Sequence, residues 1–268
     1  MKELLSQSIL AALAAGKEIL EVYETKFEVE YKDDRSPLTL ADKKANDKII
    51  ELLSHFNIPF LTEETVETEY AIRKNWTRLW IVDPLDGTKE FVKRNGEFTV
   101  NIALIESGKP ILGVIYSPVL KDLYYAAKGI GSFKLDKHDL IALENSNSLN
   151  FETIEKKAVK LPVAHTREKY TVVASRSHLS TETYAHIEEL KKNYGEIEMI
   201  NTGSSIKICL VAEGKADEYP RYGPTMEWDT AAGNAIVEFA GKKIIDLDTG
   251  DAMKYNREHI RNGSFIVK

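Results

Sequence analysis

A short apolar run that ends in two aspartates constrains the fold of this chain more than any other stretch. Leu79 to Val82 are four consecutive apolar residues, which predicts a strand buried on both faces. Pro84 and Gly87 come next, so we expect the chain to turn abruptly where this strand ends. Asp83 and Asp86 therefore emerge together at the end of a buried strand.

Two carboxylates on one turn predict a cation site. Asp83 and Asp86 can converge on one point, and like charges held that close require a positive charge between them. Ligand atoms that are all oxygen favour a hard ion such as Mg²⁺. The alternative is a simple turn, because Asp, Gly and Pro form turns in many proteins without any metal.

A pair of glutamates follows another short apolar run. Ile58 to Leu61 is followed by Thr62, Glu63 and Glu64, which repeats the pattern at Asp83. A glutamate pair on its own is usually part of a solvated loop. Beside the Asp83 site, Glu63 is instead a candidate bridging ligand of the metal.

Asp229 is the third acidic point. Residues 230–240 are expected to form a helix that ends before Gly241, and Asp229 would open it. Aspartate is a preferred N-cap residue, so capping alone would explain its presence. Because the N-terminus of a helix also attracts phosphate, Asp229 is equally a candidate metal ligand next to a bound anion.

Composition narrows the class of protein. The chain has 268 residues, of which 43% are hydrophobic and 29% are charged, and this balance argues against disorder and against an integral membrane segment. A formal net charge of -6 does not favour binding to a nucleic acid polymer. Cys209 is the single cysteine, and the first residues lack a basic start and a cleavage site. We therefore expect a cytoplasmic protein, and the sequence leaves its oligomeric state open.

The N-terminal region predicts two helices. Apolar residues at three- and four-residue steps indicate an amphipathic helix over residues 3–24, followed by a strand over 27–31 and a polar loop over 32–37. Thr39 and Asp42 form the capping-box pattern of a second helix. Alternatively, these two side chains reach toward water near the metals, and the two roles can coexist.

The order of the remaining elements predicts a mixed α/β (α+β) fold. Closely spaced strands indicate an antiparallel meander over residues 98–105, 111–116, 123–127 and 132–135. Residues 136–169 are polar and aperiodic, so we expect a loop there and a boundary between an N-terminal lobe, 1–150, and a C-terminal lobe, 151–268. Strands then alternate with helices, which is α/β organisation: strands are expected over 170–174, 196–200 and 216–219, and helices over 181–193 and 204–213. A helix over 230–240 and strands over 243–247 and 264–267 finish the chain.

Three motifs resemble the signatures of one enzyme family and follow one another in the order that this family has. Glu63-Glu64, Asp83 to Thr88 and Trp228 to Gly233 resemble the signatures of the inositol-monophosphatase-like, lithium-sensitive metal phosphatases. Residues 89–91, 94–101 and 203–207 look like the bacterial 3'(2'),5'-bisphosphate nucleotidase branch of that family. The resemblance extends over essentially the whole chain. It implies a layered αβαβα fold of the sugar-phosphatase type with two lobes.

The resemblance also implies a set of metal ligands. Glu63, Asp83 and the backbone carbonyl of Leu85 would hold one Mg²⁺, and Asp83, Asp86 and Asp229 would hold a second. A third ion, with Glu63 and water as ligands, is also consistent with the family. Thr88, paired with Asp42, would orient or deprotonate the attacking water, so Asp42, Glu63 and Thr88 are the implied catalytic residues.

The implied substrate is a small nucleotide bisphosphate. Adenosine 3',5'-bisphosphate would be hydrolysed to AMP and phosphate, and adenosine 3'-phosphate 5'-phosphosulfate would be a second substrate. Substrate contacts carry over to Glu63, Leu85, Asp86, Gly87, Thr88, Ser175, His178, Gly203, Lys207 and Asp229. Lys207 would bind the second phosphate, although most lysines on a helix face are simply solvated. His178 alone would more often be a surface cap, and residues 219–224 are candidates for lining the adenosine pocket.

Other functions remain open at this point. Since pocket loops rather than metal motifs choose the leaving group, an inositol or sugar monophosphate phosphatase is the main alternative. A nucleotide sensor without turnover would not need the full set of acidic residues. An aspartyl-phosphate mechanism requires D-x-D-x-T, whereas this chain has D-x-x-D-G-T. The resemblance also leaves open a peripheral association with the inner face of the cell membrane, but the sequence shows no basic amphipathic helix for it.

Overall fold

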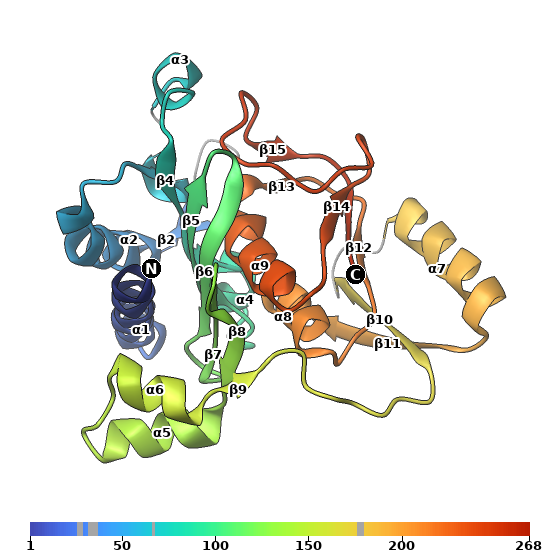
Figure 1. Ribbon diagram of the computed structural model, residues 1–268, viewed down its shortest axis with the longest axis horizontal. Helices are drawn as coiled ribbons and strands as arrows, with labels where there is room; N and C mark the ends of the chain where they lie inside the picture. The colour runs from blue at the N-terminus through green and yellow to red at the C-terminus, as the bar shows by residue number, and fades with distance from the viewer. Residues whose placement is uncertain (26–28, 32–36, 66–67, 176–179) are drawn as a thin grey trace.

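The computed structural model describes the chain except for residues 26–28, 32–36, 66–67 and 176–179. Helices and strands form five layers in the order α-β-α-β-α, which confirms the predicted mixed α/β fold (Figure 1). The helices are α1 Lys2–Tyr23, α2 Leu40–Leu53, α3 Tyr70–Arg73, α4 Thr88–Val92, α5 Lys137–Asn145, α6 Phe151–Lys157, α7 Thr181–Tyr194, α8 Ile206–Glu213 and α9 Glu227–Phe239. Short 3-10 turns are η1 Ser54–Phe56 and η2 Glu63–Thr65.

A seven-stranded sheet forms the second layer. Its order is β3-β4-β5-β6-β7-β8-β9, and every neighbouring pair is antiparallel except β3 and β4, which are parallel. The predicted meander is therefore confirmed. The strands are β3 Phe60–Thr62, β4 Arg78–Asp86, β5 Thr99–Glu106, β6 Lys109–Ser117, β7 Asp122–Ala127, β8 Gly131–Leu135 and β9 Val159–Lys160.

Helices cover both faces of this sheet. Side chains alternate along β4, so that Trp80 and Val82 belong to the core under α1 and α2, whereas Leu79 and Ile81 belong to the core under α8 and α9. The predicted strand buried on both faces is confirmed. Burial of this kind explains why the run is continuously apolar rather than alternating.

A second layer of strands lies on the far side of α8 and α9, and α7 covers it (Figure 1). Strands β10 Tyr170–Ser175 and β11 Ile197–Thr202 are parallel, and a bridge between Val172 and Glu218 links them to the sheet β12-β16-β14. The remaining strands are β12 Tyr219–Arg221, β14 Ile244–Asp246, β16 Phe265–Val267, the pair β13 Thr225–Met226 and β15 Arg261–Asn262, and the pair β1 Val29–Tyr31 and β2 Pro37–Thr39.

A glycine sets the distance between α9 and the central sheet. A Cβ atom at Gly113 on β6 would lie 2.3 Å from the carbonyl oxygen of Ala232 in α9. Only a residue without a side chain allows the two backbones to approach this closely. The contact positions α9, and therefore Asp229, against the sheet that carries Asp83 and Asp86.

The prediction of a loop over 136–169 was wrong. This region contains α5, α6 and strand β9, which extends the central sheet beyond residue 150. Asp136 accepts a hydrogen bond from the backbone of Asp139 to cap α5, and Asn150 forms a capping box with Thr153 at α6. Polar residues that looked like a loop are thus helix caps. The division into lobes at residue 150 stays a prediction.

Strand β1 lies in the predicted N-terminal strand. Val29–Tyr31 forms part of the predicted strand, whereas the rest of that strand and most of the predicted loop lie outside the described residues.

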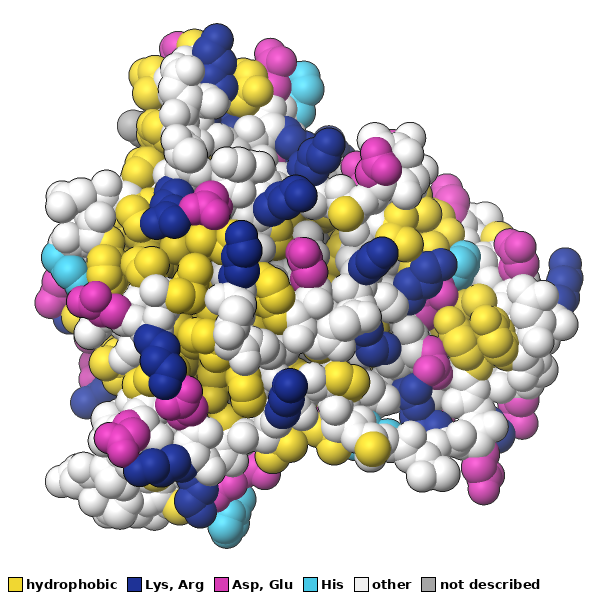
Figure 2. Space-filling view, in the orientation of Figure 1, with side chains coloured by type: hydrophobic (Ala, Val, Ile, Leu, Met, Phe, Trp, Pro, Cys, Tyr) yellow, Lys and Arg dark blue, Asp and Glu magenta, His cyan; other side chains and the backbone are white. Residues whose placement is uncertain are grey.

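Within the described part of the chain, none of the helices combines the length and apolar character that a membrane crossing requires. Basic and acidic side chains are interspersed on the face seen in Figure 2, which agrees with the weak case for nucleic acid binding.

Candidate active site

A bulge in β4 places the first two aspartates. The strand does not end at Val82 as predicted but continues to Asp86. Asp83 pairs with Asn101 and Asp86 pairs with Thr99, so β4 has one more residue than β5 between these two pairs. The backbone nitrogen of Leu85 donates a 3.1 Å hydrogen bond to Asp83 Oδ1 inside the bulge. Such bulges redirect side chains, and here the bulge replaces the predicted turn at Pro84.

Asp229 comes from α9, the helix that packs on the central sheet, and stands near the start of that helix. The helix begins at Glu227, so Asp229 is its third residue and not the N-cap that the sequence indicated. Its Oδ2 accepts a 2.7 Å hydrogen bond from the backbone nitrogen of Met226. Glu227 is fully buried and accepts hydrogen bonds from the backbones of Asn256 and Arg257. These long-range contacts explain the earlier start of the helix.

Three carboxylates meet where these elements converge. Oxygen atoms of Asp83, Asp86 and Asp229 lie within 4.8 Å of one another. Glu63 stands in the turn directly after β3, and β3 is parallel to β4, so the two strands end on the same side of the sheet. Burial holds the pKa of Asp83 well above its usual range, and the negative charges of Glu63 and Asp86 raise it further.

The cluster fits a hard divalent cation. Burial, followed by the charge of Asp86, raises the pKa of Asp229 to about 8. Buried carboxylates this close repel one another unless they share protons or a cation. An all-oxygen donor set of this charge is the kind that Mg²⁺ prefers. Leu85, whose carbonyl the resemblance assigns to the metal, lies buried in the bulge between Asp83 and Asp86.

The two residues predicted to handle water flank this cluster. Asp42 lies in the first turn of α2, is 2% exposed and contributes to the raised pKa of Asp83. Thr88 is half-buried and begins α4 directly after Gly87, whose φ of 97° is in the left-handed region that favours glycine. Capping of α2 by Thr39 is not described, because the side chain of Thr39 lies outside the described part of the structure.

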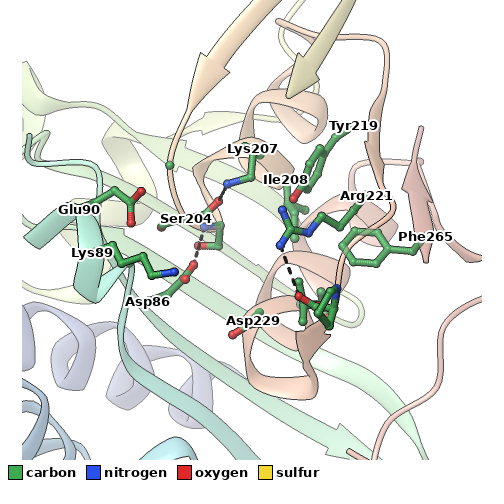
Figure 3. Close-up of a pocket in the computed structure, with 16 residues that line it drawn as sticks. Asp86, Lys89, Glu90, Ser204, Lys207, Ile208, Tyr219, Arg221, Asp229 and Phe265 are labelled. Atoms are coloured by element: carbon green, nitrogen blue, oxygen red, sulfur yellow. Dashed lines mark hydrogen bonds between the residues drawn. The ribbon is translucent and has the colours of Figure 1, made fainter. Parts of the chain in front are cut away.

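A cavity of about 170 Å³ opens beside Asp86 and Asp229 (Figure 3). Lys207 lines this cavity and is only 7% exposed, so its interpretation as a solvated lysine is wrong. Its Nζ donates a 2.6 Å hydrogen bond to the carbonyl of Ser204 and lies 5.6 Å from the centre of the Tyr219 ring. Burial lowers the pKa of Lys207 to about 8, although the charge of Asp86 opposes this shift.

Arg221 is a further cation that lines the cavity, besides Lys207 and Lys89, and the sequence did not single it out. Its Nε is buried and has no hydrogen-bond partner among the described residues. The positive charge of Arg221 contributes to the lowered pKa of Lys207, so the two side chains are close enough to repel each other. Tyr219 and Arg221 line the cavity (Figure 3), and Pro224 lines it too, whereas contact of the segment 219–224 with adenosine stays a prediction. Two neighbouring cations favour an anion between them.

The turn before α8 closes the cavity. Gly203 donates a 2.9 Å backbone hydrogen bond to Glu97 Oε2, and Ser205 donates one of 2.6 Å to Asp86 Oδ2. A Cβ atom at Gly203 would lie 2.8 Å from Glu90 Cγ, so a glycine is needed for this approach. Ser175 pairs with Thr202 at the ends of β10 and β11, which places its backbone beside the turn. The Ser175 side chain and all of His178 lie outside the described residues.

Comparison with known proteins identifies the family. Residues 1–267 match the inositol monophosphatase family. The chain belongs to this family. CysQ, the 3'(2'),5'-bisphosphate nucleotidase of Salmonella typhimurium strain LT2, is 44% identical over 98% of this chain and 99% of its own length. The protein of the same name from Escherichia coli K12 is 42% identical over the same shares of the two chains.

A solved structure agrees with this assignment. The crystal structure of CysQ from Bacteroides thetaiotaomicron has a TM-score of 0.91 with this chain at 48% identity, and the match covers 100% of this chain and 97% of that one. The resemblance drawn from the three motifs is confirmed. The inositol monophosphatase family is metal-dependent, and the buried carboxylate cluster supplies the oxygen ligands that such a dependence requires.

Proposed function

We propose that this protein is a Mg²⁺-dependent 3'(2'),5'-bisphosphate nucleotidase that hydrolyses adenosine 3',5'-bisphosphate to AMP and phosphate. The observation that carries the proposal is a cavity with carboxylates on one side and two cations, the buried Lys207 and the half-buried Arg221, on the other. Asp86 and Asp229 mark the first side, and Lys207 and Arg221 mark the second. This arrangement suits a ligand with two phosphates better than a ligand with one.

The carboxylates would hold the metal. Glu63, Asp83, Asp86, Asp229 and the carbonyl of Leu85 are the proposed ligands of two Mg²⁺ ions, with room in the family pattern for a third. Bound Mg²⁺ lowers the pKa of water and neutralises the charge of the phosphate that is transferred. Without such neutralisation, the buried carboxylates would repel a phosphate dianion.

The remaining residues of the site would position water and substrate. We assign Thr88 and Asp42 to the attacking water, whose proton Thr88 would pass to the Asp42 carboxylate. The water oxygen forms a bond to the 3'-phosphorus while the bond from phosphorus to the 3'-oxygen breaks in line. The leaving 3'-oxygen takes a proton from solvent water, Asp42 returns its proton to solvent, and AMP and inorganic phosphate are the products.

Lys207 and Arg221 would bind the 5'-phosphate. Neither cation is needed to hold the scissile phosphate, which lies with the metal ligands. The nucleoside would then lie along Tyr219 and the turn at Gly203, with Ser175 and His178 as further proposed contacts. The same contacts would admit the 5'-phosphosulfate analogue. Cytoplasmic location, with or without a peripheral association with the membrane, stays a prediction.

Phosphate release from a panel of substrates tests the proposal. With Mg²⁺ present, we expect the highest kcat/KM for adenosine 3',5'-bisphosphate, a lower value for 3'-AMP and a much lower value for inositol 1-phosphate. A preference for inositol 1-phosphate or a sugar phosphate would favour the alternative phosphatase function. Tight binding of the bisphosphate without phosphate release would instead favour a nucleotide sensor.

A further inference from the structure

A buried network of polar side chains lies beneath the site, and the chemistry described above does not use it. Thr99 and Asn101 stand two positions apart on β5, so they share one face of the strand, and they are 0% and 1% exposed. Thr99 Oγ1 lies 3.0 Å from Asn101 Oδ1 and 2.8 Å from the hydroxyls of Ser204 and Ser205. Ser205 also donates a 2.8 Å hydrogen bond to Asn101 Oδ1.

This network touches both halves of the site. Across the β4–β5 ladder, Thr99 pairs with Asp86 and Asn101 pairs with Asp83. On the other side, the backbone of Ser205 donates to Asp86, and the carbonyl of Ser204 accepts from Lys207 Nζ. The proposed metal ligand and the proposed phosphate-binding lysine therefore both bond to the backbone of the Ser204–Ser205 turn, and the side chains of these two serines belong to the network.

The network has more contacts between oxygen atoms than it has hydroxyl hydrogens to place in them. Three hydroxyls supply one hydrogen each and the Asn101 carbonyl supplies none, so the four contacts cannot all contain a hydrogen at once. Asn101 Nδ2 is in addition buried without a hydrogen-bond partner among the described residues. A network with spare acceptors and a spare donor has more than one possible arrangement of its hydrogens, so a ligand that orients Asp86 can select one of them.

We propose that Thr99 and Asn101 are positioning residues that couple Asp86 to Ser204 and Lys207, so that a cation at Asp86 strengthens binding of the 5'-phosphate. This inference rests on the proposed function. A bound cation fixes the orientation of the Asp86 carboxylate, whose Oδ2 accepts the hydrogen bond from the backbone N–H of Ser205. The hydroxyl hydrogens then have one arrangement, and the Ser204 carbonyl that holds Lys207 is fixed. Coupling of this kind is reciprocal, so the phosphate also strengthens cation binding.

Calorimetric titration with AMP tests the coupling, because AMP carries the 5'-phosphate and lacks the scissile one. The dissociation constant is measured in excess Mg²⁺ and in EDTA, and the ratio of the two values is the coupling factor. For the wild type we expect a factor of about 5 to 150. Thr99→Val removes the hydroxyl at nearly constant volume and should reduce the factor at least about 3-fold, whereas Thr99→Ser should retain it.

A buried threonine outside the site serves as the control. Thr171 on β10 is 1% exposed and its hydroxyl donates only to the nearby Lys169 carbonyl, so Thr171→Val should keep the wild-type factor. A residue that merely supports the fold would weaken binding equally with and without Mg²⁺ and leave the ratio unchanged. An unchanged ratio in Thr99→Val therefore overturns the inference.

A second variant covers the case in which Thr99→Val does not fold. Ser205→Ala removes two of the four contacts, those of the Ser205 hydroxyl with Thr99 and Asn101, and keeps the backbone bond to Asp86. It should therefore also reduce the factor, and an unchanged factor there overturns the inference. The proposed function is judged separately by phosphate release from the bisphosphate. If the wild type hydrolyses the bisphosphate but the variants keep the full ratio, only the coupling is wrong.

Discussion

The backbone nitrogen of Ser205 donates a 2.6 Å hydrogen bond to Asp86 Oδ2, although the two residues stand 119 positions apart in the chain. Asp86 thereby has a role in each half of the site, as a proposed metal ligand and as the anchor of the turn before Lys207. Asp83, in contrast, accepts a local hydrogen bond within the described part of the chain, from the backbone nitrogen of Leu85 to its Oδ1 inside the bulge. Asp83 is therefore the better position at which to test the metal site alone.

Asp83→Asn should nearly abolish turnover and leave the fold intact. The amide has almost the same volume and can still accept the bond from Leu85, but it cannot supply the charge that two cations share. We expect kcat to fall by far more than 10-fold, where 10-fold corresponds to about 1.4 kcal/mol of barrier. Asp122→Asn, on β7 and paired with Lys134 outside the cluster, should leave kcat unchanged. Retention of more than about a tenth of the activity by Asp83→Asn would refute the bridging role.

Removal of metal should make stability depend on pH. Burial and crowding raise the pKa of Asp229 to about 8 and hold that of Asp83 well above its usual range. A carboxylate with a raised pKa in the folded state binds more protons folded than unfolded, so the free energy of unfolding falls as pH rises from about 4 toward 8. In EDTA we expect the Tm to fall over this range by more than about 2–4 °C, the shift for 1 kcal/mol in chains of this size.

Saturating Mg²⁺ is the matched condition for that measurement. The cation replaces the shared protons, so the decline of Tm between pH 5 and 8 should be much smaller than in EDTA. Asp83→Asn in EDTA should also show a smaller decline, because one of the repelling charges is gone. Identical pH profiles with and without Mg²⁺ would mean that the carboxylates do not hold the cation.

The sequence predicted the elements whose signals are local. Four apolar residues before Asp83 were sufficient to predict the central strand, and the strands of the meander were all found. The helices α5 and α6 were missed because each has few buried apolar residues, such as Leu140 and Ile154, and so shows little periodicity. Their caps at Asp136 and Asn150 are polar residues that also suit loops.

Parts of the site that depend on distant partners were not predictable. Glu227 starts α9 early because Arg257 and the backbone of Asn256 satisfy its buried carboxylate, and no local pattern indicates that pairing. Thr99 appears in the sequence as one more strand residue, and its contact with Ser204 spans 105 positions. Arg221 stands in a segment that was assigned to the pocket, yet only the fold shows that its charge lies near Lys207.

Gly113→Ala should destabilise the protein by distorting the contact between β6 and α9. The new methyl group would meet the Ala232 carbonyl oxygen at 2.3 Å, and neither backbone can yield without moving Asp229. Overpacking of this kind costs about 1–3 kcal/mol, which predicts a Tm lower by roughly 2–12 °C. Gly223→Ala is the control for stability, because its Cβ atom would meet its nearest neighbour at an ordinary 3.5 Å. An unchanged Tm for Gly113→Ala would show that the two layers are less tightly packed than the structure indicates.

Lys207 should determine the preference for bisphosphates, and this preference should depend on pH. A charge-assisted contact is worth roughly 1.5 to 3 kcal/mol, so Lys207→Ala should lower kcat/KM for adenosine 3',5'-bisphosphate by about 10- to 150-fold. The value for 3'-AMP should barely change, because that substrate has no second phosphate. The exposed Lys191 on α7 provides the control, and Lys191→Ala should leave both substrates unaffected.

The pH dependence follows from the pKa of Lys207, which burial lowers to about 8. Above this pH the side chain loses its positive charge, so the ratio of kcat/KM for the bisphosphate to that for 3'-AMP should fall as pH rises through 8. Taking the ratio cancels titrations at the metal site that affect both substrates. In Lys207→Ala the ratio should be low and independent of pH, whereas Lys207→Arg should keep it high above pH 8. Equal losses on both substrates in Lys207→Ala would show that Lys207 supports the fold or the metal cluster, because a residue that binds only the 5'-phosphate cannot affect a substrate without one.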